Sequence, residues 1–182
     1  MSLEAGKYIV ISTHREENID IKDHFQILAS SLNSVAEAYQ LPIIFSTHPR
    51  TRKRIHDAGF KFHPLIQNTE PLGFFDYVHL QKHAFVVLSD SGSISEESAM
   101  MGFPAVSIRT STERPEAVDA GTIVLGGIRS DQMINAIEIT TKMPVKGEIE
   151  FPWEYTVTNC SERVIKLIQS YTAIVNKVIW DK

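Results

Sequence analysis

Apolar runs of strand length alternate with amphipathic helical patterns along most of this 182-residue chain. Near-continuous apolar runs at 7–12, 42–46, 85–88 and 104–108 predict strands, and runs at 64–67 and 122–125 predict two more. Apolar spacings of three and four predict helices over 21–39, 74–83, 131–142 and 159–182. Shorter helices are expected after Pro49, after the turn at 89–93 and after Pro115. The stretch 143–156 has two prolines and no period, which indicates a loop.

Strands that alternate with helices favour an α/β fold, a Rossmann-like parallel sheet with helices on both faces. Polar clusters follow four of the predicted strands, at 14–18, 48–50, 89–93 and 109–114. Ligands of such sheets bind beyond the carboxyl ends of the strands, where the loops converge. The sequence therefore predicts a single site at one rim of the sheet.

The stretch 85–102 contains the strongest local signal for that site. An apolar strand runs into Ser91-Gly92-Ser93, and a helix follows. Helix N-termini carry unpaired N–H groups and a positive dipole end, so they bind anions such as a phosphate or diphosphate. An alternative interpretation needs no ligand: Ser93 and Glu96 have the spacing of a capping box. Spacing alone favours neither interpretation.

Composition narrows the classes of function. The net charge of −4 gives no global case for nucleic acid, and the basic positions at 48–56 spread over more than one helix face. The one cysteine, Cys160, excludes an internal disulfide and favours a reducing compartment, so we expect the cytoplasm. There is no secretory signal and no apolar run of membrane-spanning length. Residues 1–6 are expected to be a cloning remnant or a linker.

No metal-ligand spacing, Walker loop or G-x-G-x-x-G motif occurs, so no metal or cofactor is predicted. Several rim residues have chemistry that suits a phosphorylated ligand. His14 can donate to a phosphate or carry a proton, Arg114 can grip a diphosphate, and Glu97 can accept hydroxyl groups of a ribose. His14 and Arg114 also have ordinary alternatives: a loop histidine that caps the next helix, and a loop salt bridge.

Four segments then occur in a distinctive order: Thr-His-Arg-Glu-Glu-Asn at 13–18, Glu-Pro-Leu at 70–72, Ser-Asp-Ser-Gly-Ser-Ile-Ser-Glu-Glu at 89–97, and Thr-Glu-Arg-Pro-Glu-Ala-Val at 112–118. Together they resemble the C-terminal half of the non-hydrolysing UDP-N-acetylglucosamine 2-epimerases. The resemblance covers the chain from about residue 7 to the final helix. The run at 46–51 is similar to a branch acting on UDP-2-acetamido-2,6-dideoxy-L-talose, which serves surface polysaccharide synthesis.

The resemblance implies a glycosyltransferase-B arrangement of two Rossmann-like domains with the UDP-sugar between them. It implies that Ser91, Gly92 and Ser93 hold the diphosphate, although the family usually has glycine where Ser93 stands. It also implies that Glu97 binds the ribose hydroxyls and that Arg114 binds the sugar or a phosphate.

Four further roles are implied by the resemblance. Tyr77 stands where the family places an aromatic residue against uracil. His14 is expected to contact the diphosphate and to take part in catalysis. Arg15 and His48 match positions of a regulatory UDP-sugar site in some bacterial members.

The reaction of the family inverts C2 of the sugar by anti elimination of UDP and re-addition to the other face. The resemblance implies that the essential carboxylates of the family lie in an N-terminal domain, and we expect that domain to lie outside this chain. We therefore expect residues 7–158 to form the UDP-binding domain and 159–182 to form a helix that crosses back to the missing domain. The chain alone is expected to bind UDP weakly without epimerising, and the full-length form is expected to be a homodimer.

Two alternatives stay open from the sequence. The chain could be a fragment of a glycosyltransferase-B enzyme that transfers its sugar to an acceptor, which would release UDP without exchange at C2. It could also be a stand-alone nucleotide-sugar-binding module without chemistry.

Overall fold

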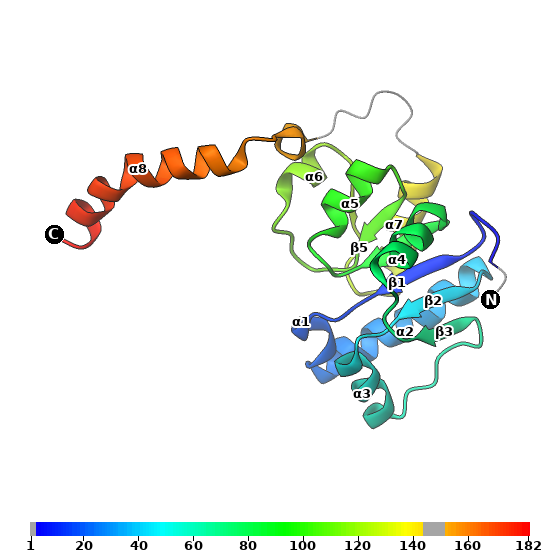
Figure 1. The fold of residues 1–182 in the computed structure, drawn as a ribbon. Helices are drawn as coiled ribbons and strands as arrows, with labels where there is room; N and C mark the ends of the chain where they lie inside the picture. The colour runs from blue at the N-terminus through cyan, green and yellow to red at the C-terminus, as the bar shows by residue number, and fades with distance from the viewer. Residues whose placement is uncertain (1–2, 144–151) are drawn as a thin grey trace. The chain divides into compact units, whose positions relative to one another are not determined.

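The computed structural model describes residues 3–143 and 152–182, and the chain divides into two compact units, 1–151 and 152–182. The first unit is built on a six-stranded parallel sheet (Figure 1). Its strands are β1 (Ile9–Ser12), β2 (Ile43–Ser46), β3 (Ile66–Thr69), β4 (Val86–Ser89), β5 (Ala105–Ser107) and β6 (Val124–Leu125), in the order β3-β2-β1-β4-β5-β6. The structure confirms the predicted Rossmann-like α/β fold.

Within residues 3–143, six helices connect these strands and a seventh follows β6. They are α1 (Glu16–Ile19), α2 (Lys22–Tyr39), α3 (Pro49–Ala58), α4 (Phe74–His83), α5 (Ile94–Met101), α6 (Pro115–Asp119) and α7 (Ser130–Lys142). Proline opens α3 and α6, where its missing N–H costs nothing. The short helix α1 was not expected, because four residues leave no apolar period to detect.

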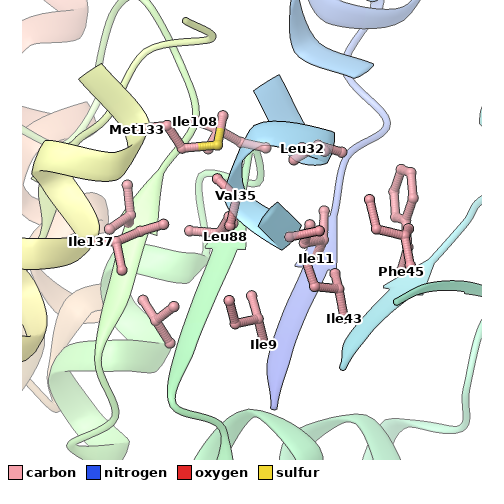
Figure 2. Packing of buried hydrophobic residues seen from close by; sticks show 14 of the residues in the cluster. Ile9, Ile11, Leu32, Val35, Ile43, Phe45, Leu88, Ile108, Met133 and Ile137 are labelled. Carbon is pink, nitrogen blue, oxygen red and sulfur yellow. The ribbon is translucent and has the colours of Figure 1, made fainter. Parts of the chain in front are cut away.

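The main core lies on one face of the sheet. Figure 2 shows side chains of β1, β2 and β4 meeting those of α2 and α7. Ile9, Ile11 and Leu88 are 0% exposed there, so this face of the central strands is closed to solvent. On the opposite face, the Tyr8 hydroxyl donates to the Leu80 carbonyl of α4 at 2.8 Å. Alternate strand residues therefore face two helical layers, which explains the near-continuous apolar runs.

The second unit contains a 3₁₀ helix, η1 (Trp153–Thr156), and the long helix α8 (Cys160–Ile179). Arg163 lies over the Trp153 ring, with 5.5 Å from guanidinium carbon to ring centroid. Asn159 is the N-cap residue of α8 and makes no side-chain cap hydrogen bond. The helix α8 is amphipathic, as predicted. Its apolar stripe is exposed within this unit and consists of Val164, Leu167, Ile168, Tyr171, Val175, Val178 and Ile179.

Most of the loop expected at 143–156 lies outside the described residues, as do residues 1–2 of the expected linker. The proposed division after residue 158 stays a prediction. Within 3–143 and 152–182, no helix has the length and apolarity needed to span a bilayer.

Close packing at the end of β6 gives a testable prediction. A Cβ atom on Gly126 would lie 2.5 Å from Val106 Cγ1 and 3.2 Å from Ala136 Cβ, both of them buried. Gly126→Ala should therefore lower the free energy of unfolding by about 1–3 kcal/mol, measured by urea denaturation. Gly73→Ala is the matched control, because its nearest neighbour would be Asp76 Oδ2 at 3.7 Å. Equal stability of the two variants would contradict the packing described here.

Candidate functional site

The two central strands end side by side at the carboxyl rim of the sheet. Ser12 of β1 is in register with Ser89 of β4, and the chain order of the strands reverses between them. The loops after these strands lead to opposite sides of the sheet. The region between the two loops, called the crevice below, is where ligands of such folds bind. The polar turns 13–15 and 90–93 therefore meet where a ligand of this fold is expected.

Asp90 joins the two turns. Its side chain is 0% exposed. Its Oδ2 accepts hydrogen bonds from Thr13 Oγ1 at 2.5 Å, from the Arg15 backbone N–H at 3.0 Å and from Asn18 Nδ2 at 3.1 Å. The backbone N–H of His14 lies 3.1 Å from both carboxylate oxygens. A buried carboxylate is tolerated because these donors replace its lost water.

The position of the His14 ring follows from the same carboxylate. His14 Nδ1 lies 3.5 Å from Asp90 Oδ1, and the imidazole is about half exposed at 49%. A carboxylate beside Nδ1 favours a proton on that nitrogen, which leaves Nε2 available to a ligand. The structure places His14 in the turn after β1, and its contact with a ligand stays a prediction.

The turn 91–93 has a different hydrogen-bond pattern from the capping box considered above. Ser93 makes no cap hydrogen bond to α5, and its hydroxyl donates to Glu97 Oε1 at 2.7 Å. Glu96 accepts from Arg114 Nε at 2.5 Å. The capping-box interpretation is therefore wrong, because both of its side chains have other partners. The first N–H groups of α5 keep no side-chain cap.

Two guanidinium groups flank Gly92. A Cβ atom added to Gly92 would lie 3.7 Å from Arg15 Nη2 and 3.9 Å from Arg114 Nη2. Ser91 and Ser93 hydroxyls lie 3.0 Å apart in the same turn. This turn, flanked by two cations at a helix N-terminus, has the chemistry of a diphosphate cradle.

Glu97 and Tyr77 adjoin this turn, since Glu97 is bonded to Ser93 and its charge acts on Tyr77. Gln81 Nε2 donates to Glu97 Oε2 at 2.8 Å, so both carboxylate oxygens of Glu97 are held. Burial raises the pKa of Tyr77 to about 12; a hydrogen bond with the Ser12 side chain opposes this rise, and the carboxylates of Glu97 and Asp90 add to it. The Tyr77 hydroxyl thus stays neutral and is anchored at the end of β1.

Arg109 is a rim residue whose importance the sequence did not reveal. It is 5% exposed, and its guanidinium bonds Glu17 Oε1 and Glu113 Oε1, both at 3.3 Å. Arg15 Nη1 also lies 3.5 Å from Glu113 Oε1. The hydrogen bond from Arg109, helped by the charge of Arg15, holds the pKa of the Glu113 carboxyl below its usual range. An arginine directly after an apolar strand was the only available signal.

His48 lies in a neighbouring surface hollow that His14, Arg15, Glu16 and Arg50 also line. Its Nδ1 accepts from the Arg50 backbone N–H at 3.3 Å and so caps α3. The Arg50 guanidinium is paired with Glu16 at 2.8 Å and with Asp20. The structure therefore brings Arg15 and His48 together, as a shared ligand site would require.

The predicted residues occupy two adjoining places. His14, Arg15, Ser91, Gly92, Ser93, Glu97 and Arg114 gather around the crevice between β1 and β4, Tyr77 adjoins it through Ser12, and His48 lies in the hollow beside it. The sequence did not indicate that Asp90, Arg109 and Gln81 hold the site residues in place, because their contacts link distant parts of the chain.

A parallel sheet of strand order 3-2-1-4-5-6, with polar loops gathered where the strand order reverses, defines a Rossmann-like domain. The family model for UDP-N-acetylglucosamine 2-epimerase matches residues 1–169. The chain belongs to the UDP-N-acetylglucosamine 2-epimerase family.

Individual relatives agree with this assignment. The chain is 35% identical over 136 residues to the UDP-N-acetylglucosamine 2-epimerase of Methanocaldococcus jannaschii. The aligned stretch covers 72% of this chain and 37% of that protein. It is 31% identical over 170 residues to the enzyme of Neisseria meningitidis, which covers 90% of this chain and 44% of that protein. The chain thus spans less than half the length of these curated relatives.

Solved structures of the family superpose on the chain. The UDP-N-acetylglucosamine 2-epimerase of Rickettsia bellii matches with a TM-score of 0.73 and 32% identity, over 99% of this chain and 48% of that one. The Methanocaldococcus jannaschii enzyme in complex with UDP-GlcNAc and UDP matches with a TM-score of 0.74 and 30% identity, over 90% of this chain and 45% of that one.

The role of Asp90 gives a prediction about stability. Asp90→Asn replaces one acceptor oxygen with an NH₂ group that must face existing donors, so we expect a loss of about 3 kcal/mol in the free energy of unfolding. Urea denaturation followed by circular dichroism measures this loss. Asp57→Asn, at a 54% exposed side chain, is the control and should change stability by less than about 0.5 kcal/mol. Equal effects of the two changes would rule out the structural role of Asp90.

Proposed function

We propose that this chain is the UDP-binding half of a UDP-N-acetylhexosamine 2-epimerase. The observation that carries the proposal is the turn 91–93 at the start of α5, with the guanidinium groups of Arg15 and Arg114 on either side of Gly92. In the proposed complex, the backbone of this turn and the two cations hold the diphosphate. Family membership supports uridine as the nucleoside and an N-acetylhexosamine as the sugar.

The proposed chemistry is elimination and re-addition. Elimination breaks the C1–O bond to UDP, whose two electrons leave with the diphosphate. It also breaks the C2–H bond, whose two electrons form the C1–C2 double bond while the proton passes to a base. Re-addition of UDP and return of a proton to the opposite face of C2 give the epimer. Arg15, Arg114 and the α5 N-terminus stabilise the charge that develops on the departing diphosphate. His14, oriented by Asp90, contacts the diphosphate oxygen that is released from C1 and exchanges a proton with it.

Glu97 is proposed to accept the ribose hydroxyls, and Tyr77 to place its ring against uracil while its hydroxyl stays anchored. Arg15 and His48 are proposed to contact a second, regulatory UDP-sugar in the adjoining hollow. The missing N-terminal domain is proposed to supply the carboxylates for the C2 proton, within a homodimeric cytoplasmic enzyme. The run at 46–51 favours the L-talose branch, which assays with both UDP-sugars would test.

Binding of the diphosphate can be measured apart from binding of the nucleoside. We expect the chain to bind UDP in calorimetry, and Arg114→Gln to weaken UDP about tenfold, because one charge-assisted contact is lost. The same change should leave uridine binding unaltered. Arg129→Gln, at a 67% exposed side chain paired with Asp131, is the matched control and should bind UDP normally. Absence of UDP binding, or an equal loss for UDP and uridine, would refute the proposed cradle.

The division of labour between the halves gives a separate prediction. Incubated with UDP-GlcNAc in D₂O, this chain alone should incorporate no deuterium at C2, because the carboxylates that move the C2 proton are proposed to lie elsewhere. Proton NMR measures the incorporation, and a full-length family enzyme serves as the positive control. Deuterium at C2 with this chain alone would show that the 182 residues contain the complete catalytic set. Transfer of the sugar to an acceptor without exchange would indicate a glycosyltransferase instead.

A further inference from the structure

Gln81 is a buried polar side chain that the mechanism above does not use. It lies on α4, one helical turn beyond Tyr77, and is 1% exposed. Its Nε2 donates to Glu97 Oε2 at 2.8 Å, whereas its Oε1 has no hydrogen-bond partner within residues 3–143 and 152–182. A buried amide with an unpaired oxygen is costly for the fold. Within the described residues, the side chain of Gln81 therefore makes its hydrogen bond to Glu97 while its own unpaired oxygen lowers the stability of the fold.

The chemistry of the contact fixes its direction. A carboxylate only accepts hydrogen bonds, so the NH₂ group of Gln81 must face Glu97. Ser93 approaches the other oxygen, with its hydroxyl 2.7 Å from Glu97 Oε1. One donor on each oxygen prevents rotation of the carboxylate about its last side-chain bond. Glu97 is thus held by α4 on one side and by the turn before α5 on the other.

The remaining acceptor sites of the Glu97 carboxylate match the two hydroxyl groups of a vicinal diol. An ionised carboxylate offers about four lone-pair sites, two on each oxygen. Within residues 3–143 and 152–182, Gln81 and Ser93 each fill one site, which leaves one further acceptor site on Oε1 and one on Oε2. Two adjacent hydroxyl groups, such as the 2′ and 3′ hydroxyls of a ribose, can fill both sites at once. A rotated carboxylate would satisfy only one of them.

We propose that Gln81 and Ser93 are positioning residues that fix the Glu97 carboxylate for two-point recognition of a ribose diol. This inference rests on the proposed function, in which Glu97 binds the ribose. It assigns to this chain a built-in preference for ribonucleotides over 2′-deoxyribonucleotides. The preference depends on two side chains that do not themselves touch the nucleotide sugar.

The test compares UDP with 2′-deoxy-UDP in calorimetry on the intact 182-residue chain. Wild type should bind UDP more tightly than 2′-deoxy-UDP. Gln81→Met, which removes the donor at similar volume, should lower this ratio about three- to tenfold, mainly through weaker UDP binding. Ser93→Ala should act in the same direction, and its exposed position keeps the fold intact. Gln26→Met, on the exposed face of α2, is the matched control and should leave the ratio unchanged.

A double-mutant comparison separates positioning from general packing. In a Glu97→Gln background, Gln81→Met should not alter the ratio further, because the group that it positions is gone. Equal weakening of both nucleotides, or an unchanged ratio in Gln81→Met and Ser93→Ala, would overturn the inference. Should Gln81→Met fail to fold, Ser93→Ala decides alone. A wild type that binds UDP without discrimination refutes only this inference, whereas a wild type that binds no UDP refutes the proposed function and the inference with it.

Discussion

The buried carboxylate of Asp90 is the contact on which the crevice depends. It receives hydrogen bonds from the Thr13 and Asn18 side chains and from the backbone N–H groups of His14 and Arg15. These contacts hold the turn after β1 against the turn after β4, so one carboxylate fixes both walls. Without them, a negative charge would lie unpaired between two strand ends, which proteins rarely tolerate.

Charge around this contact is arranged before any ligand binds. Glu113 lies between Arg109 and Arg15, and Glu96 receives a hydrogen bond from Arg114. The cations that flank Gly92 are therefore held in place by carboxylate partners. In the proposed complex, the diphosphate would meet donors that need little reorganisation, which is the condition for strong electrostatic stabilisation of a leaving group.

The sequence predicted the sheet and the convergence of its polar loops, because buried parallel strands leave near-continuous apolar runs and parallel strands end at one rim. It also placed Ser91 and Gly92 correctly at the start of a helix. It did not reveal Asp90 or Gln81, whose partners lie 77 and 16 residues away. The Ser93 and Glu96 spacing was misleading, since Glu97 and Arg114 compete successfully for those side chains.

The 77 residues that separate Thr13 from Asp90 have a consequence for folding. β1, β2 and β3 can pair through local βαβ units, but the crevice exists only after β4 has joined β1 across that long stretch. Non-local pairings of this kind bear a loop-closure entropy and form slowly. The two walls of the crevice therefore come together only when β4 is paired with β1, so the site depends on the completed centre of the sheet.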